Sequence, residues 1–141
     1  MGGILAIDLG EKKSGFAYAD PTRTVVRPLD GLRAGEASDG LVSHLRRLVE
    51  ERDVATILLG VPWRAGGEAS ERTRRSQAFA EHLRGLFPRI EVCVHDEKLT
   101  TKEAEALLHE AGYRGREARA RRDSWSALVL LRDWIAAGEP R

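Results

Sequence analysis

One uninterrupted apolar segment near the middle of the chain constrains the possible folds more than any other feature. Residues 54–59 read Val-Ala-Thr-Ile-Leu-Leu, without alternation of polar and apolar side chains. A strand with one solvated face alternates, whereas a strand without alternation is covered on both faces. The sequence therefore predicts an α/β protein in which helices flank a sheet.

Four further segments have the pattern of strands. Residues 3–9, 14–20 and 23–29 are separated by turn residues, and we expect them to form a three-stranded antiparallel meander. Residues 90–95 follow a helical pattern and predict one more strand. The expected fold is a mixed five-stranded sheet, in which two parallel strands join the meander through helical crossovers.

Helix signals lie between and after these strands. Ser38 and Ser70 are each expected to precede a helix, and Ser70 is a good N-cap. Thr100, with an acidic residue three positions later, has the pattern of a capping box for a third helix. A basic loop is expected over residues 113–122, followed by a last helix from about Asp123 to Ala137.

Length and composition limit the class of protein. The chain has 141 residues, of which 42% are hydrophobic, so we expect a single domain over residues 1–141. The sequence shows neither a basic leader nor a long apolar stretch, which predicts a cytoplasmic protein with no membrane partner. Its one cysteine, Cys93, lies in an apolar strand pattern and is expected to be a reduced core thiol.

Three acidic positions stand at the ends of expected elements. Asp8 ends the first strand, Glu97 follows the last strand, and Asp123 begins the last helix. Taken singly, each is also explained as an ordinary turn or helix-end carboxylate. Together they predict a site for Mg²⁺ or Mn²⁺, because these ions prefer carboxylate oxygens and ligand sites gather at the carboxyl ends of strands. Such a site can hydrolyse phosphodiester bonds.

Positive charge is concentrated in a few segments, although the net charge is only +1. Groups of lysine and arginine are often just solvated faces, but they also neutralise phosphates and bind polyanions. Because these groups flank the acidic positions, we expect a nucleic acid as partner. The candidate nucleic-acid-binding residues are Lys12, Lys13, Arg64, Arg72, Arg74, Arg75, Lys98, Arg114, Arg116, Arg119, Arg121 and Arg122.

Two other side chains near the acidic positions have alternative interpretations. Trp63, in the loop after the central strand, is expected to be a packed loop anchor; the alternative is stacking on an unpaired base. His95 precedes the acidic pair and is expected to have a structural role, with contact to metal or water as the alternative.

Several motifs occur in a specific order over nearly the whole chain. They are Ile7-Asp8-Leu9-Gly10, Gly60-Val61-Pro62, the segment from Asp96 to Thr101, Glu110-Ala111-Gly112, and Asp123 with Leu130-Leu131. This order resembles the RuvX/YqgF family, whose members are described as Holliday junction resolvases and as pre-16S ribosomal RNA nucleases. The resemblance implies a ribonuclease H-like fold, with Asp8, Glu97 and Asp123 as a catalytic, metal-binding triad. Its implied partners are branched or single-stranded DNA, or precursor ribosomal RNA.

The chain departs from the usual pattern of that family at two places. Lys98 stands where arginine is usual, and Ser124-Trp125-Ser126 stand where a small, alanine-rich helix start is usual. A non-catalytic nucleic-acid or ribosome-assembly binding module is therefore an alternative to a nuclease. An actin-like ATPase is a weaker alternative, because such proteins need two related domains. No long exposed apolar stripe stands out, so we expect a monomer or a weak homodimer.

Overall fold

The sheet of the computed structural model has five strands. The structure describes residues 2–36, 38–98 and 100–141. The strand order is β3-β2-β1-β4-β5, in which β2 is antiparallel to its neighbours β1 and β3, and β4 and β5 run parallel to β1. This arrangement confirms the predicted meander with two added parallel strands. The strands are β1 (Gly3–Asp8), β2 (Ser14–Ala19), β3 (Val26–Leu32), β4 (Val54–Val61) and β5 (Glu91–Asp96).

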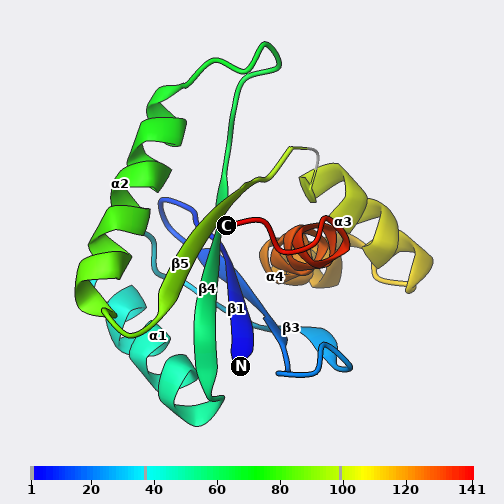
Figure 1. Cartoon of the computed structure of the whole chain (residues 1–141). Helices are drawn as coiled ribbons and strands as arrows, with labels where there is room; N and C mark the ends of the chain where they lie inside the picture. Colours follow the sequence, from blue (N-terminus) through cyan, green and yellow to red (C-terminus); the bar gives the residue numbers. More distant parts are fainter. Residues whose placement is uncertain (1, 37, 99) are drawn as a thin grey trace.

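Helices cover the sheet on both faces. Figure 1 views the sheet nearly edge-on, with α1 and α2 on one side and α3 and α4 on the other. The prediction of a sheet flanked by helices is confirmed. The helices are α1 (Asp39–Glu51), α2 (Glu71–Leu86), α3 (Thr100–Glu110) and α4 (Gly115–Ala136). In the described residues, no helix is both long and apolar enough to cross a membrane.

The core consists of two clusters, one on each face of the sheet. Alternate residues of β1 enter different clusters, Leu5 and Ile7 toward α1 and α2 and Ile4 and Ala6 toward α4. All four side chains are fully buried, which explains why the strand sequences do not alternate in polarity. Cys93 is a buried free thiol in the second cluster, as predicted.

The third strand lies three residues further along the chain than predicted. It spans Val26–Leu32, whereas the apolar pattern indicated residues 23–29. The turn before it is longer because the Asp20 carboxylate accepts the N–H of Val25, and Arg23 takes a left-handed conformation with φ of 59°. Pro28 is tolerated within β3 because this strand is at the edge of the sheet.

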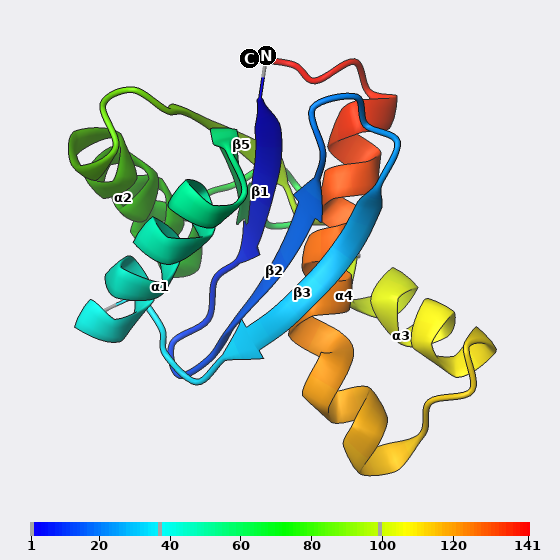
Figure 2. The ribbon, with the colours of Figure 1, turned by 90° about the horizontal axis from the view of Figure 1, so that it is seen from below.

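The last helix begins at Gly115, so the predicted basic loop over residues 113–122 is wrong. Residues 115–122 form the first turns of α4, and Asp123 lies about two turns inside the helix instead of at its start. Alanine, arginine and glutamate are strong helix formers, and this half of the helix has no apolar stripe because it projects beyond the sheet (Figure 2). A polar, solvated helix was thus mistaken for a loop.

The helix caps agree only in part with the expectations. Ser70 caps α2 and forms a capping box with Thr73. Thr100 is instead the first residue of α3, and its hydroxyl donates to the carbonyl oxygen of Glu97 over 2.9 Å. Leu99, in the motif between Asp96 and Thr101, lies outside the described residues.

Candidate active site

Asp8 and Glu97 come together at the carboxyl ends of the parallel strands. Asp8 is the last residue of β1 and Glu97 directly follows β5, with β4 between these two strands. Both strands run parallel to β4, so their carboxyl ends meet at one edge of the sheet, as the sequence predicted. The two carboxyl groups are close enough that each affects the pKa of the other.

Glu97 is held in place by its own main chain. Its N–H donates to the carbonyl oxygen of Val61 at the end of β4, and its carbonyl oxygen accepts the N–H of Thr100. Its side chain, 14% exposed, lies over Gly60, where an added β-carbon would stand 2.7 Å from Oε2 of Glu97. Gly60 therefore leaves the space through which Glu97 reaches Asp8.

The charges of this pair are not balanced. Burial raises the pKa of Asp8 well above its usual value, and the neighbouring charges of Glu97 and Asp123 raise it further. Burial also raises the pKa of Glu97, an effect that Arg72 opposes from 4.0 Å away. The pair therefore holds a proton more tightly than isolated carboxyls do, and a bound cation would relieve the repulsion.

Asp123 approaches the same edge from α4. Its carboxylate lies 3.6 Å from Nζ of Lys13, and its side chain is 27% exposed. The neighbouring Ser124 fixes this part of the helix, because its hydroxyl oxygen accepts the N–H of Phe16 in β2 over 3.1 Å. The irregular pairing of β2 with β3 near Phe16 accompanies this bond. Ser124, one of the departures from the family pattern, thus joins α4 to the sheet.

The acidic residues offer suitable donors for a divalent cation without forming a finished site. Carboxylate oxygens are the ligands that Mg²⁺ and Mn²⁺ prefer, and Asp8 and Glu97 are two adjacent ones. Across residues 2–36, 38–98 and 100–141, no three His, Cys, Asp or Glu side chains are already gathered as a metal site. Asp123 contributes its charge to Asp8, but its nearest cation is Lys13.

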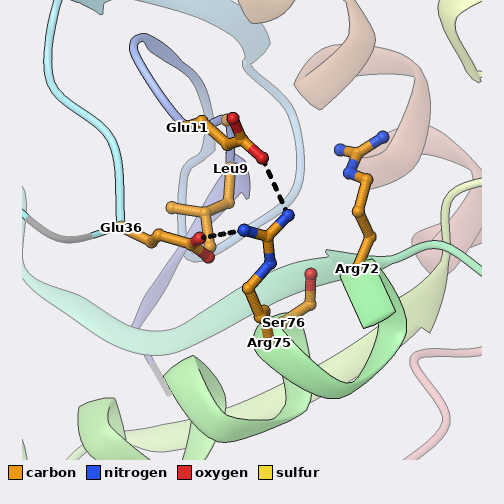
Figure 3. Close-up of a pocket in the computed structure, with 7 residues that line it drawn as sticks. Leu9, Glu11, Glu36, Arg72, Arg75 and Ser76 are labelled. Atoms are coloured by element: carbon orange, nitrogen blue, oxygen red, sulfur yellow. Dashed lines mark hydrogen bonds and ion pairs between the residues drawn. The ribbon is translucent and has the colours of Figure 1, made fainter. Parts of the chain in front are cut away.

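Some of the candidate phosphate-binding residues already have carboxylate partners. Arg75 lies between Glu11 and Glu36, at 2.8 and 3.5 Å, in a small pocket beside Leu9 (Figure 3). Its charge is therefore largely neutralised. The candidates with such a partner are Lys13, Arg72, Arg75 and Arg122. Within the described residues, no ion pair is found for Lys12, Arg64, Arg74, Lys98, Arg114, Arg116, Arg119 or Arg121.

Sequence reasoning missed Arg33 near this edge. Arg33 directly follows β3, is exposed, and lines a cavity together with Lys13, Arg119 and Asp123. It is an isolated charge and belongs to no basic run. A correct end for the third strand would have placed it at the strand end, beside the site.

Trp63 and His95 have different outcomes. The prediction of Trp63 as a packed anchor is wrong, because the indole is 40% exposed. The loop is instead held by its own main chain, through Arg64 N–H to Glu68 and Gly67 N–H to Arg64, and by the Thr73 hydroxyl, which donates to Pro62. His95 Nε2 lies 2.6 Å from a carboxylate oxygen of Asp133, which fits the structural role.

The sheet order and the position of its helices define an α/β protein of the ribonuclease H-like class. The sequence model of the RuvX family, described as Holliday junction resolvase, matches residues 2–137. The chain therefore belongs to the RuvX family, and the resemblance noted in the sequence is confirmed.

Related proteins are similar to this chain over almost their whole length. A protein of Rubrobacter xylanophilus named "Putative pre-16S rRNA nuclease" is 39% identical, over 97% of this chain and 94% of its own. A protein of Dictyoglomus thermophilum with the same name is 35% identical, over 94% of each chain. The similarity thus includes all elements from β1 to α4.

Solved structures share the fold at low sequence identity. The Fowlpox virus resolvase, in complex with Holliday junction DNA, has a TM-score of 0.60 at 13% identity, covering 98% of this chain and 99% of its own. RuvC of T. thermophilus, in complex with a Holliday junction substrate, has a TM-score of 0.55 at 12% identity, covering 99% and 98%. At these identities the likeness supports the fold alone.

Proposed function

We propose that the protein is a divalent-metal-dependent nuclease that hydrolyses phosphodiester bonds of structured nucleic acid. Asp8, Glu97 and Asp123 are its proposed catalytic residues and would hold Mg²⁺ or Mn²⁺. The observation that carries the proposal is the meeting of two half-buried carboxyls at strand ends: Asp8 ends β1, and Glu97 directly follows β5. Such a pair costs stability unless a cation balances it, which is typical of a functional site.

The residues of the proposed site would have different roles in the reaction. Asp8 and Glu97 supply a rigid pair of oxygens on the sheet, while Asp123 comes from α4 and would exchange Lys13 for the cation. A bound divalent cation would activate water and stabilise the charge that develops on the phosphate. Arg72, 4.0 Å from Glu97, opposes the effect of burial and lowers the pKa of that carboxyl. Lys13, once released from Asp123, would stand ready to bind a phosphate oxygen.

The proposed substrate class follows from charge and from the relatives' names. Basic residues around the acidic edge would bind phosphates, and related proteins carry the names resolvase and pre-16S rRNA nuclease. Branched DNA and precursor ribosomal RNA are therefore the two substrates to test. Paired symmetric cuts in a junction require two copies acting together, whereas shortening from one end requires only a monomer.

The test is a cleavage panel with Mg²⁺ and with Mn²⁺. Labelled four-way junction, flap, single-stranded and precursor ribosomal RNA substrates are incubated with the wild type and with Asp8→Asn and Glu97→Gln. We expect both variants to lose cleavage by at least about a hundredfold, because each removes one proposed metal ligand. Asp96→Asn is the matched control: this neighbour of Glu97 is exposed, and its side chain accepts the N–H of Lys98, which asparagine also allows.

Two results would overturn the proposal. Cleavage by Asp8→Asn and Glu97→Gln at the wild-type rate would remove the catalytic site from this edge. Binding of the substrates by the wild type without cleavage of any of them, with either metal, would instead favour the non-catalytic binding module.

A further inference from the structure

A groove runs from Asp123 along the edge of the sheet, between the end of β3 and the first half of α4. Its volume is about 230 Å³. Figure 2 shows β3 and α4 side by side at this edge of the molecule. We call it the β3–α4 groove; its walls and floor include Lys13, Gly31, Arg33, Arg119, Ala120 and Asp123.

The chemistry of the groove is that of an anion site. Three of its side chains are cations that come from three separate segments: the β1–β2 turn, the residue after β3, and α4. Lys13 is shared with Asp123, but Arg33 and Arg119 have no ion-pair partner within the described part of the chain. Their charges are therefore not neutralised by the protein.

The opposite side of the acidic edge is different. There Arg72 lies 4.0 Å from Glu97. Arg75 lies between Glu11 and Glu36 (Figure 3). An approaching phosphate would have to compete with these carboxylates for the arginines. The distribution of charge thus favours binding of a phosphate chain along the β3–α4 groove over binding on the side of Arg72 and Arg75.

The shape of the groove agrees with its charge. Gly31 and Ala120 contribute no long side chains to it, so the space between the arginines stays open. Phosphate contacts position a nucleic-acid strand without reading its sequence, and arginine binds phosphate oxygens in a bidentate manner. The groove therefore offers what a sugar-phosphate backbone requires: open space lined by unneutralised cations, ending at a catalytic carboxylate.

We propose that the β3–α4 groove binds the phosphodiester backbone of the substrate strand next to the bond that is cut, through Arg33 and Arg119. The proposal rests on the proposed nuclease function, since Asp123 at the end of the groove is one of its catalytic residues. It adds a direction for the strand and one binding residue, Arg33, that lies in no basic run of the sequence.

The test measures binding separately from cleavage. All variants carry Glu97→Gln and are kept in a chelator, so that no strand is cut. A labelled single strand of DNA and a labelled RNA of the same sequence are titrated at several salt concentrations. Arg33→Gln and Arg119→Gln are expected to weaken binding by about three- to tenfold each, and to reduce the slope of log K against log salt by about 0.7 for each phosphate that is no longer neutralised.

Arg89→Gln is the matched control. Arg89 is exposed and precedes β5, at the end of the sheet opposite to Asp8 and Glu97. The Arg89→Gln variant loses the same charge as the groove variants. We expect its affinity and salt slope to equal those of the parent, which carries Glu97→Gln alone. Arg33→Lys should restore most of the binding that Arg33→Gln removes, because the charge returns. Neither arginine of the groove has an ion-pair partner in the described residues, so all these variants should keep the melting temperature of the parent.

The outcomes separate this proposal from the proposed function. If Arg33→Gln and Arg119→Gln bind both the DNA and the RNA strand as tightly as Arg89→Gln does, the proposed role of the groove is wrong, even if the wild type cleaves. Weakened binding in these two variants, with a wild type that cuts nothing, would retain the groove and reject the nuclease. Weakening for RNA alone, or for DNA alone, would support the groove and identify the strand that it takes.

Discussion

The α-carbon of Gly15 lies directly against the main chain of Asp123: a β-carbon added to Gly15 would stand 2.1 Å from the carbonyl carbon of Asp123. The main chains of β2 and α4 are thus in direct contact at Gly15 and Asp123, without a side chain between them. The position of Asp123 relative to Asp8 consequently depends on the absence of a side chain at Gly15.

Gly15→Ala is expected to push α4 away from β2 and to displace Asp123. Overpacking against fixed backbone costs about 1–3 kcal/mol. We expect a matching loss of the free energy of unfolding, measured with urea, and a fall in cleavage of at least about tenfold at a temperature where the variant is folded. Gly85→Ala is the control: nothing lies within 4 Å of its β-carbon, and alanine in α2 should add about 0.5–1 kcal/mol. Full cleavage by folded Gly15→Ala would contradict this role of Gly15.

Two serines on the same helix provide a comparison of satisfied and unsatisfied hydroxyls. Ser124 accepts the N–H of Phe16, so Ser124→Ala leaves a buried donor unpaired and should cost about 1–3 kcal/mol. Ser126 is also buried, but among the described residues its hydroxyl has no hydrogen-bond partner. Ser126→Ala should therefore be neutral or slightly stabilising. The measurement is urea unfolding of both variants, and an equal loss in both would contradict the assigned role of Ser124.

Asp8→Asn is expected to stabilise the metal-free protein at neutral pH. Burial raises the pKa of Asp8 in the folded state, so the folded chain binds more protons than the unfolded chain at pH values above the ordinary 3.8. The free energy of unfolding of the wild type therefore falls as the pH rises through this window. Asparagine removes the ionisation, and we expect a gain of about 0.5–2 kcal/mol.

The gain from Asp8→Asn should depend on pH. In a chelator, the difference in melting temperature between variant and wild type should grow as the pH rises above the ordinary pKa of 3.8, and should shrink as the pH falls toward it. Asp30→Asn, on exposed β3, is the control for the loss of one negative charge. A variant that is less stable than the wild type at neutral pH would show that Asp8 is held by favourable contacts instead of strained by burial.

The sheet and the acidic pair could be predicted because each depends on local signals. Residues 54–59 are apolar without alternation since both faces of β4 are buried, and Asp8 and Glu97 stand at strand ends in the sequence itself. Parallel pairing alone then brings them to one edge. The position of Asp123 within its helix could not be predicted in this way. It depends on where a solvated helix begins, and residues 115–122 have no apolar periodicity.

Long-range charge pairing could not be predicted at all. Arg72 and Arg75 looked equivalent to Arg119 in the sequence, yet the first two face carboxylates from other segments. Which arginines remain available for phosphate is set by tertiary contacts between residues far apart in the chain, such as Arg75 with Glu11. No spacing rule predicts such a pairing.

Two tryptophans that differ widely in burial permit one more test of the packing. Trp134 is fully buried in the cluster between α4 and the sheet, and its Nε1 donates to the carbonyl oxygen of Pro140 over 3.0 Å. Trp134→Ala should lower the free energy of unfolding by about 3–5 kcal/mol. Trp63 is 40% exposed, and Trp63→Ala should stay within about 0.5 kcal/mol of the wild type. Urea unfolding of both variants measures the difference, and a large loss for Trp63→Ala would restore it as a loop anchor.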